Sequence, residues 1–108
     1  MSDPGRGRER AGAATAGITF ELPGALQPYA GGSTEVVIDR SCATLAEAIS
    51  ALAERSPGVV DRMIDELGAV RPHVNIFVDG ESIRFLAGLD TPVTERSTIV
   101  VVPAVSGG

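Results

Sequence analysis

The segment that most restricts how this chain can fold is residues 98–102, TIVVV, close to the C-terminus. All five side chains are β-branched, and such residues favour an extended strand over a helix. No polar residue interrupts the run after Thr98, which is typical of a strand covered on both faces and lying inside a sheet. Pro103 ends the strand because proline cannot donate a ladder hydrogen bond. We therefore expect the last strand to be central and able to pair parallel to a neighbour.

Two strand patterns open the folded part of the chain. Ile18, Phe20 and Leu22 alternate with other residues at the period of a half-buried strand. Residues 34–39 are rich in β-branched side chains and follow after a loop that contains proline and glycine. Two consecutive strands joined by a modest loop predict an antiparallel hairpin.

A second hairpin is predicted further along. Residues 74–78, VNIFV, form a clear interior strand, and Asp79-Gly80 follows directly. Asp-Gly is a favoured dipeptide of two-residue hairpin turns. We expect residues 81–85 to return as the partner strand and residues 86–92 to be irregular.

One main helix lies between the two hairpins. Thr44 and Glu47 have the spacing of a capping box, in which the Thr44 hydroxyl accepts from the Glu47 N–H and the Glu47 side chain reaches back to the start of the helix. Apolar residues then recur at helical spacing, which predicts a helix from residue 45 to about residue 55 that stops before Pro57. These apolar residues are Leu45, Ala48, Ile49, Leu52 and Ala53. Pro57 is suited to open a second short helical turn covering residues 59–64.

The order of these elements is β, β, α, β, β, β. With 108 residues and 11.1 kDa, the chain fits one α+β domain of about five strands in a mixed sheet around one main helix, which is the β-grasp arrangement. A ferredoxin-like fold, the alternative, needs a second full helix before the last strand. We expect the domain to span residues 17–103. Residues 1–16 hold no large apolar residue after Met1 and predict a disordered tail, and residues 104–108 predict a flexible one.

Composition argues against several functions. The 9 basic and 14 acidic residues give a net charge of −5, so nucleic acid and anionic membranes are poor partners. All the basic residues are arginines, which excludes a Schiff-base lysine. A single cysteine, Cys42, and a single histidine, His73, exclude a disulfide framework and a Cys/His zinc site. We interpret Cys42 as a small half-buried residue and His73 as a loop residue, and we expect a protein that is not an enzyme.

Membrane and metal sites find no support either. No apolar run approaches the length of a membrane span, and no hydrophobic stretch follows the charged N-terminus as in a secretory signal. We interpret the acidic residues Asp61, Asp65 and Glu66 as solvated surface rather than a metal site. The expectation is a soluble cytoplasmic protein that binds no cofactor or metal.

The C-terminus carries the most specific chemical signal. Five residues follow Pro103, and fully extended they reach about 16 Å. The carboxylate of Gly108 has no side chain beside it, so an activating enzyme could form an acyl-adenylate there without steric hindrance. Gly107 lets the backbone enter a narrow channel in an extended form, and the small residues before it suit the same channel. The threading residues are Ala104, Val105, Ser106 and Gly107. An ordinary frayed terminus is the alternative.

These features resemble a known family. The β-grasp order together with residues 100–108, VVVPAVSGG, is similar to the ubiquitin-like sulfur carriers of the MoaD/ThiS superfamily. Residues 74–89 resemble the CysO-like branch, with its valine-asparagine-aliphatic strand, Arg-Phe pair and Gly-Leu. Leu22-Pro23 and Gly31-Gly32 match its opening, and the likeness covers about residues 17–108.

The resemblance implies a reaction cycle. An E1-like enzyme would adenylate Gly108 with ATP, and a sulfur donor would convert it to a thiocarboxylate. In the CysO-like branch the client is a PLP-dependent cysteine synthase, and a JAMM-type metalloprotease then releases cysteine. A molybdopterin-synthase small subunit, a thiazole-forming carrier and a secondary-metabolite sulfur carrier stay open as alternatives. From other functional classes, so do a non-covalent ubiquitin-like interaction module and a protein modifier that conjugates to lysines.

A partner-docking surface is a further expectation. Alternation points Arg84 away from the core, between Ile83 and Phe85, and arginines are enriched at interfaces. Apolar residues in the irregular stretch that follows either cap the core or form an apolar patch for a partner. The candidate docking residues are Arg84, Phe85, Leu86 and Leu89.

Overall fold

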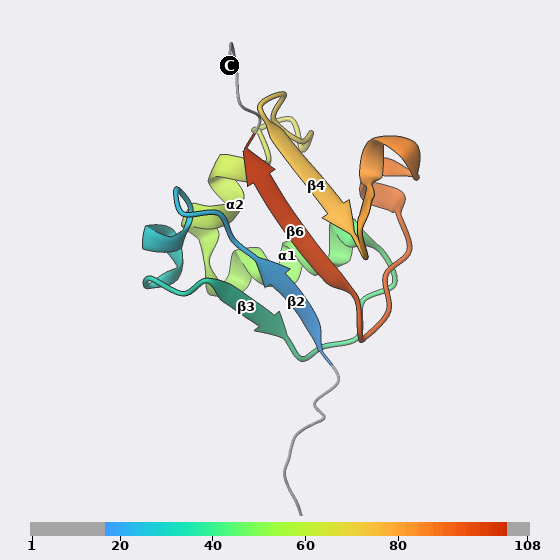
Figure 1. The fold of residues 1–108 in the computed structure, drawn as a ribbon, viewed down its shortest axis with the longest axis horizontal. Helices are drawn as coiled ribbons and strands as arrows, with labels where there is room; N and C mark the ends of the chain where they lie inside the picture. Colours follow the sequence, from blue (N-terminus) through green and yellow to red (C-terminus); the bar gives the residue numbers. More distant parts are fainter. Residues whose placement is uncertain (1–16, 104–108) are drawn as a thin grey trace, which may run out of the picture.

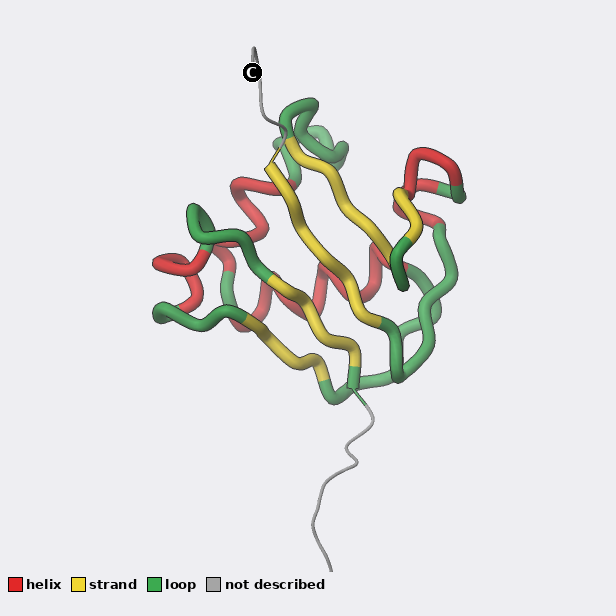
Figure 2. Tube along the Cα trace, in the orientation of Figure 1, coloured by secondary structure: helices red, strands yellow, loops and turns green. Residues whose placement is uncertain are grey.

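The computed structural model describes residues 17–103. It shows one five-stranded sheet in the order β3-β2-β6-β4-β5, with two helices lying against one face (Figures 1 and 2). The strands are β2 (Ile18–Glu21), β3 (Glu35–Ile38), β4 (Val74–Val78), β5 (Glu81–Ser82) and β6 (Thr98–Pro103). The helices are α1 (Leu45–Arg55), α2 (Pro57–Met63) and the 3₁₀ turns η1 (Gln27–Ala30), η2 (Ile83–Phe85) and η3 (Gly88–Asp90).

The last strand occupies the centre of the sheet. β6 runs parallel to β2, with Phe20 opposite Ile99, and antiparallel to β4, with Val74 opposite Pro103. β2 and β3 form the predicted antiparallel hairpin. The element order and the central parallel strand confirm the β-grasp fold and exclude the ferredoxin-like alternative.

The prediction that β6 is covered on both faces is wrong. Ile99 and Val101 point toward the helices and are buried, whereas Val102 is 37% exposed on the opposite face. Both helices follow β3 in the chain and lie behind the sheet as it is viewed in Figure 1. Within residues 17–103 no other helix of comparable length remains to form a second layer. The valine run is thus buried on one side and accessible on the other.

Helix α1 begins and ends where the sequence predicts. The Glu47 N–H donates to Thr44 Oγ1 (3.3 Å), and Glu47 Oε1 accepts from the Ala43 N–H (2.9 Å). The returning bond thus reaches one residue further back than in the standard capping box. The predicted second turn is α2, which starts at Pro57. In the part of the chain that the structure describes, neither helix is long and apolar enough to cross a bilayer.

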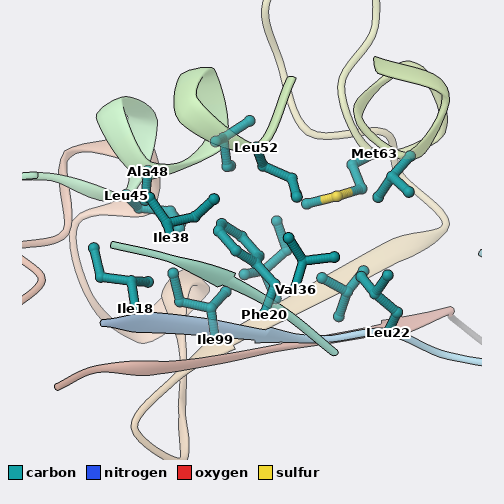
Figure 3. Close-up of a cluster of buried hydrophobic side chains, with 14 of the residues drawn as sticks. Ile18, Phe20, Leu22, Val36, Ile38, Leu45, Ala48, Leu52, Met63 and Ile99 are labelled. Atoms are coloured by element: carbon teal, nitrogen blue, oxygen red, sulfur yellow. The ribbon is translucent and has the colours of Figure 1, made fainter. Parts of the chain in front are cut away.

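The core lies between α1 and the sheet (Figure 3). Leu45 and Leu52 project from α1 toward Phe20 and Ile99 of the two central strands, and all four are fully buried. Met63 at the end of α2 closes one end of this layer. Burying such side chains is worth about 1.5–3 kcal/mol each, so this layer stabilises the packing of α1 on the sheet.

The predicted partner strand at residues 81–85 is shorter than expected. The Asp79-Gly80 turn forms as predicted, with φ of 50° and 90°, but β5 ends at Ser82. The Ser82 hydroxyl accepts from the Arg84 N–H (3.3 Å) and turns the chain into η2. As a result Ile83 is buried and Phe85 is 81% exposed, although strand alternation would have put both on one face.

Candidate functional site: the root of the C-terminal tail

The predicted reactive residues lie outside the described part of the chain. These are Gly108 and the threading residues Ala104, Val105, Ser106 and Gly107. The structure places the strand from which they continue. β6 ends at Pro103, opposite Val74 at the first residue of β4. The tail therefore starts from the middle of the sheet rather than from an edge.

The start of β6 is held by a polar network. Asp79 Oδ1 accepts from the Thr98 N–H (2.9 Å), and Asp79 Oδ2 accepts from the Ser97 hydroxyl (3.1 Å). Ser97 is 1% exposed, and its Oγ also accepts from the Thr94 N–H (2.9 Å). Because the polar groups at this buried hydroxyl are paired, the network fixes the start of β6 without the cost of a buried unpaired group.

A pocket lies on the helix side of the sheet beside Pro103. Its volume is ≈ 240 Å³, and Leu26, Tyr29, Arg62 and His73 line it together with Pro103. We call it the tail-root pocket. Sequence reasoning missed it because its walls come from η1, α2 and two strands that meet only in the folded chain. His73, interpreted as a loop residue, does lie in the loop before β4, and it borders this pocket.

The open face of the sheet is a second feature that sequence reasoning missed. Val37 and Val102 are 40% and 37% exposed, and Phe77 and Val100 are half-buried on the same face. The apolar run in β6 is the sequence signal for this face, but such a run also predicts a strand that is covered on both faces. An apolar face that no other part of residues 17–103 covers is a common feature of interaction surfaces.

The structure brings only part of the predicted docking set together. Arg84 and Phe85 are exposed on η2, and Leu86, which follows them, is 43% exposed. Leu89 does not join them, because it lies in η3 and packs against the core. This turn follows β5 at the edge of the sheet, with β4 between it and β6.

The remaining polar candidates have structural roles. Cys42 is half-buried, packs against the core and places its Sγ 3.7 Å from the Arg40 carbonyl oxygen. Asp65 accepts from the Ala69 and Leu67 N–H groups (3.0 and 2.8 Å), and these bonds, with the nearby Arg71, lower the pKa of its carboxyl. Within residues 17–103 no cluster of three His, Cys, Asp or Glu side chains could hold a metal ion.

Comparison with known proteins identifies the family. The model of the ThiS family matches residues 20–108 of the 108-residue chain. The chain belongs to the ThiS family. Sulfur carrier protein CysO of Mycobacterium tuberculosis is 34% identical over 93 residues, which is 84% of this chain and 98% of that protein.

Solved structures agree with this family. The fold of this chain matches a chain of the BexX/CysO complex from Amycolatopsis orientalis with a TM-score of 0.74 at 30% identity. The match covers 84% of this chain and 99% of the other. It matches SAMP1 of Haloferax volcanii with a TM-score of 0.70 at 28% identity, covering 85% and 99%. The chain is therefore a ubiquitin-like sulfur carrier with a β-grasp fold, and the family is one of carriers rather than catalysts.

Proposed function

We propose that this ThiS-family carrier acts through the carboxylate of Gly108. In the first step a carboxylate oxygen attacks the α-phosphorus of ATP in an activating enzyme, and pyrophosphate leaves. In the second, sulfide supplied by a sulfur donor attacks the acyl carbon and AMP leaves, which gives a thiocarboxylate. The energy of ATP thus converts a poor acyl group into a reactive sulfur nucleophile held on a protein.

The observation that carries this proposal is the attachment of the tail. A five-residue tail ending in Gly-Gly continues from the exposed end of a strand whose other end is held by Asp79 and Ser97. A narrow active site can take an extended glycine-rich segment only if the folded domain stays outside. About 16 Å of extended chain suffices to separate the two.

The client that we favour is a PLP-dependent cysteine synthase, with a JAMM-type metalloprotease releasing the product. The 34% identity to CysO over 84% of the chain supports this client, as does the CysO-like segment at residues 74–89. A molybdopterin-synthase small subunit or a secondary-metabolite carrier would use the same activation step. Incubating the thiocarboxylate form of the carrier with each candidate client enzyme, and identifying the sulfur-containing product by mass spectrometry, distinguishes these pathways.

A protein modifier is the second candidate function. The match to a small archaeal modifier protein of Haloferax volcanii favours it, at 32% identity over 61% of this chain. Such a carrier would join Gly108 to lysine amines of other proteins rather than pass on sulfur. The product separates the two: isopeptide-linked conjugates or a thiocarboxylate.

The test is the intact mass after incubation with ATP, the activating enzyme and a sulfide source. We expect a mass gain equal to one sulfur replacing one oxygen. Deletion of Gly108 should abolish the gain while the domain stays folded, because this residue lies beyond β6. An unchanged mass with an enzyme shown to be competent on another carrier would contradict the proposal and favour the non-covalent interaction module.

A further inference from the structure

The tail-root pocket has an apolar interior and a polar rim. Leu26, Val74 and Val101 are buried residues that form its floor, with Pro103 at one wall. Arg62 and His73 also line it and supply its polar groups. A cavity of about 150 Å³ can hold a benzene ring, so ≈ 240 Å³ is enough for one large apolar side chain.

One wall of the pocket is pre-organised around Tyr29. The Arg62 guanidinium carbon lies 3.6 Å from the centroid of the Tyr29 ring, and Arg62 Nη1 donates to the Gly58 carbonyl (3.2 Å). A Cβ on Gly58 would approach the Tyr29 ring to 3.2 Å, so a glycine there lets the ring lie flat on α2. A wall fixed in this way loses little further entropy when a partner binds.

The length of the tail decides what can reach the pocket. Pro103 is both a wall of the pocket and the last residue before the tail. A protein that holds Gly108 in its active site must bring the mouth of that site within about 16 Å of Pro103. The rim of that mouth therefore faces the residues around Pro103, the tail-root pocket among them.

We propose that the tail-root pocket receives an apolar side chain from the rim of the activating enzyme's active site. An aromatic or branched aliphatic side chain would fill the space above Leu26 and Val101. An oxygen acceptor beside it would meet Arg62, whose guanidinium has five N–H donors, one of which bonds Gly58. An anchor side chain in a pre-formed pocket is the usual centre of an interface. This inference rests on the proposed function, because the activating enzyme is the partner that it invokes.

The test fills the pocket from within. Ala25 is exposed and lines the pocket, so Ala25→Phe adds a ring there without disturbing the core. The matched control is Ala46→Phe, which adds the same ring at a second pocket of ≈ 260 Å³ beside α1, and this pocket shares no lining residue with the tail-root pocket. For each purified protein, the rate of thiocarboxylate formation is measured by intact mass against carrier concentration, with the purified activating enzyme, ATP and sulfide.

We expect Ala25→Phe to raise the KM for the carrier about tenfold with kcat little changed, since Gly108 still reaches the active site. Ala46→Phe should behave as the wild type. Arg62→Met, which keeps the stem of the side chain over Tyr29, should raise KM about threefold. Thermal unfolding verifies that each variant is folded, and the smaller substitution Ala25→Leu replaces Ala25→Phe if that variant unfolds.

Other outcomes overturn the inference in distinguishable ways. If the wild type reacts and Ala25→Phe has an unchanged KM, the pocket is not the contact and the carrier function stands. If Ala46→Phe raises KM equally, the effect is general and the pocket is again excluded. If the wild type forms no thiocarboxylate, the proposed function fails and this inference fails with it.

Discussion

The two ends of β6 differ in how they are held. At its start, the Thr98 N–H and the buried Ser97 hydroxyl both bond the carboxylate of Asp79, and the Thr19 N–H donates to the Ser97 carbonyl (3.0 Å). At its end, pairing with β2 stops at Val100, and the exposed Pro103 is paired with β4 alone among the strands of residues 17–103. The difference teaches that one strand can stabilise the fold at one end and present a tail at the other.

This contrast predicts a separation of effects. Substitutions at the start of β6, up to Ile99, should lower the free energy of unfolding and leave the kinetics of the folded protein unchanged. Substitutions at its exposed end should do the reverse. The following changes test this from the largest expected effect on stability to the smallest.

Ile99→Ala should have the largest effect on stability. Ile99 is fully buried between β2 and β4, and deleting such a side chain leaves a cavity that costs about 2–5 kcal/mol. Urea unfolding followed by circular dichroism measures the change. A loss well under 1 kcal/mol would contradict the placement of Ile99 in the core.

Asp79→Ala should be intermediate. It leaves the Thr98 N–H and the buried Ser97 hydroxyl without their acceptor, and it puts a Cβ without a polar group at a φ of 50°. We expect a loss of about 1–3 kcal/mol in the free energy of unfolding. Asp79→Asn, which keeps one acceptor and tolerates this φ, is the control and should lose less. The KM for the activating enzyme should be unchanged in both.

Val101→Thr and Val102→Thr compare the two faces of β6 with one chemical change. Val101 is 2% exposed and Val102 is 37% exposed. A hydroxyl buried without a partner costs about 1–3 kcal/mol, so Val101→Thr should destabilise by this amount. Val102→Thr should change stability by less than about 0.5 kcal/mol. Equal losses in urea unfolding would mean that both faces are covered.

Asp65 should give the smallest effect, visible only in acid. Hydrogen bonds from the Ala69 and Leu67 N–H groups lower the pKa of its carboxyl below the ordinary 3.8. The stabilisation is therefore complete above that ordinary value and is lost as the pH falls through the lowered pKa of the folded state. Asp65→Asn should remove this part of the acid dependence, measured as unfolding midpoints between neutral and low pH. An identical pH profile in the variant would show that the carboxylate does not stabilise the turn.

Local sequence rules predicted much of the fold. The bounds of α1 follow from Thr44, Glu47 and Pro57 because caps and helix breakers act within one turn. The Asp79-Gly80 turn was predictable because few dipeptides tolerate two positive φ angles in succession. The length of β5 was not predictable, since the Ser82 side chain competes with the strand ladder for the backbone of Arg84.

The candidate site divides in the same way. The sequence by itself carries the prediction for the tail, because Gly107 and Gly108 are read directly from the chain and this prediction does not depend on how the chain folds. The unbroken TIVVV run also predicted that the last strand would be central, which the sheet order confirms, although the cover on both faces from which this was inferred is wrong. Only the tertiary structure decided which face of that strand stays open and where the tail-root pocket lies. Those features depend on η1, α2 and β6 meeting in space, which no pattern along the chain encodes.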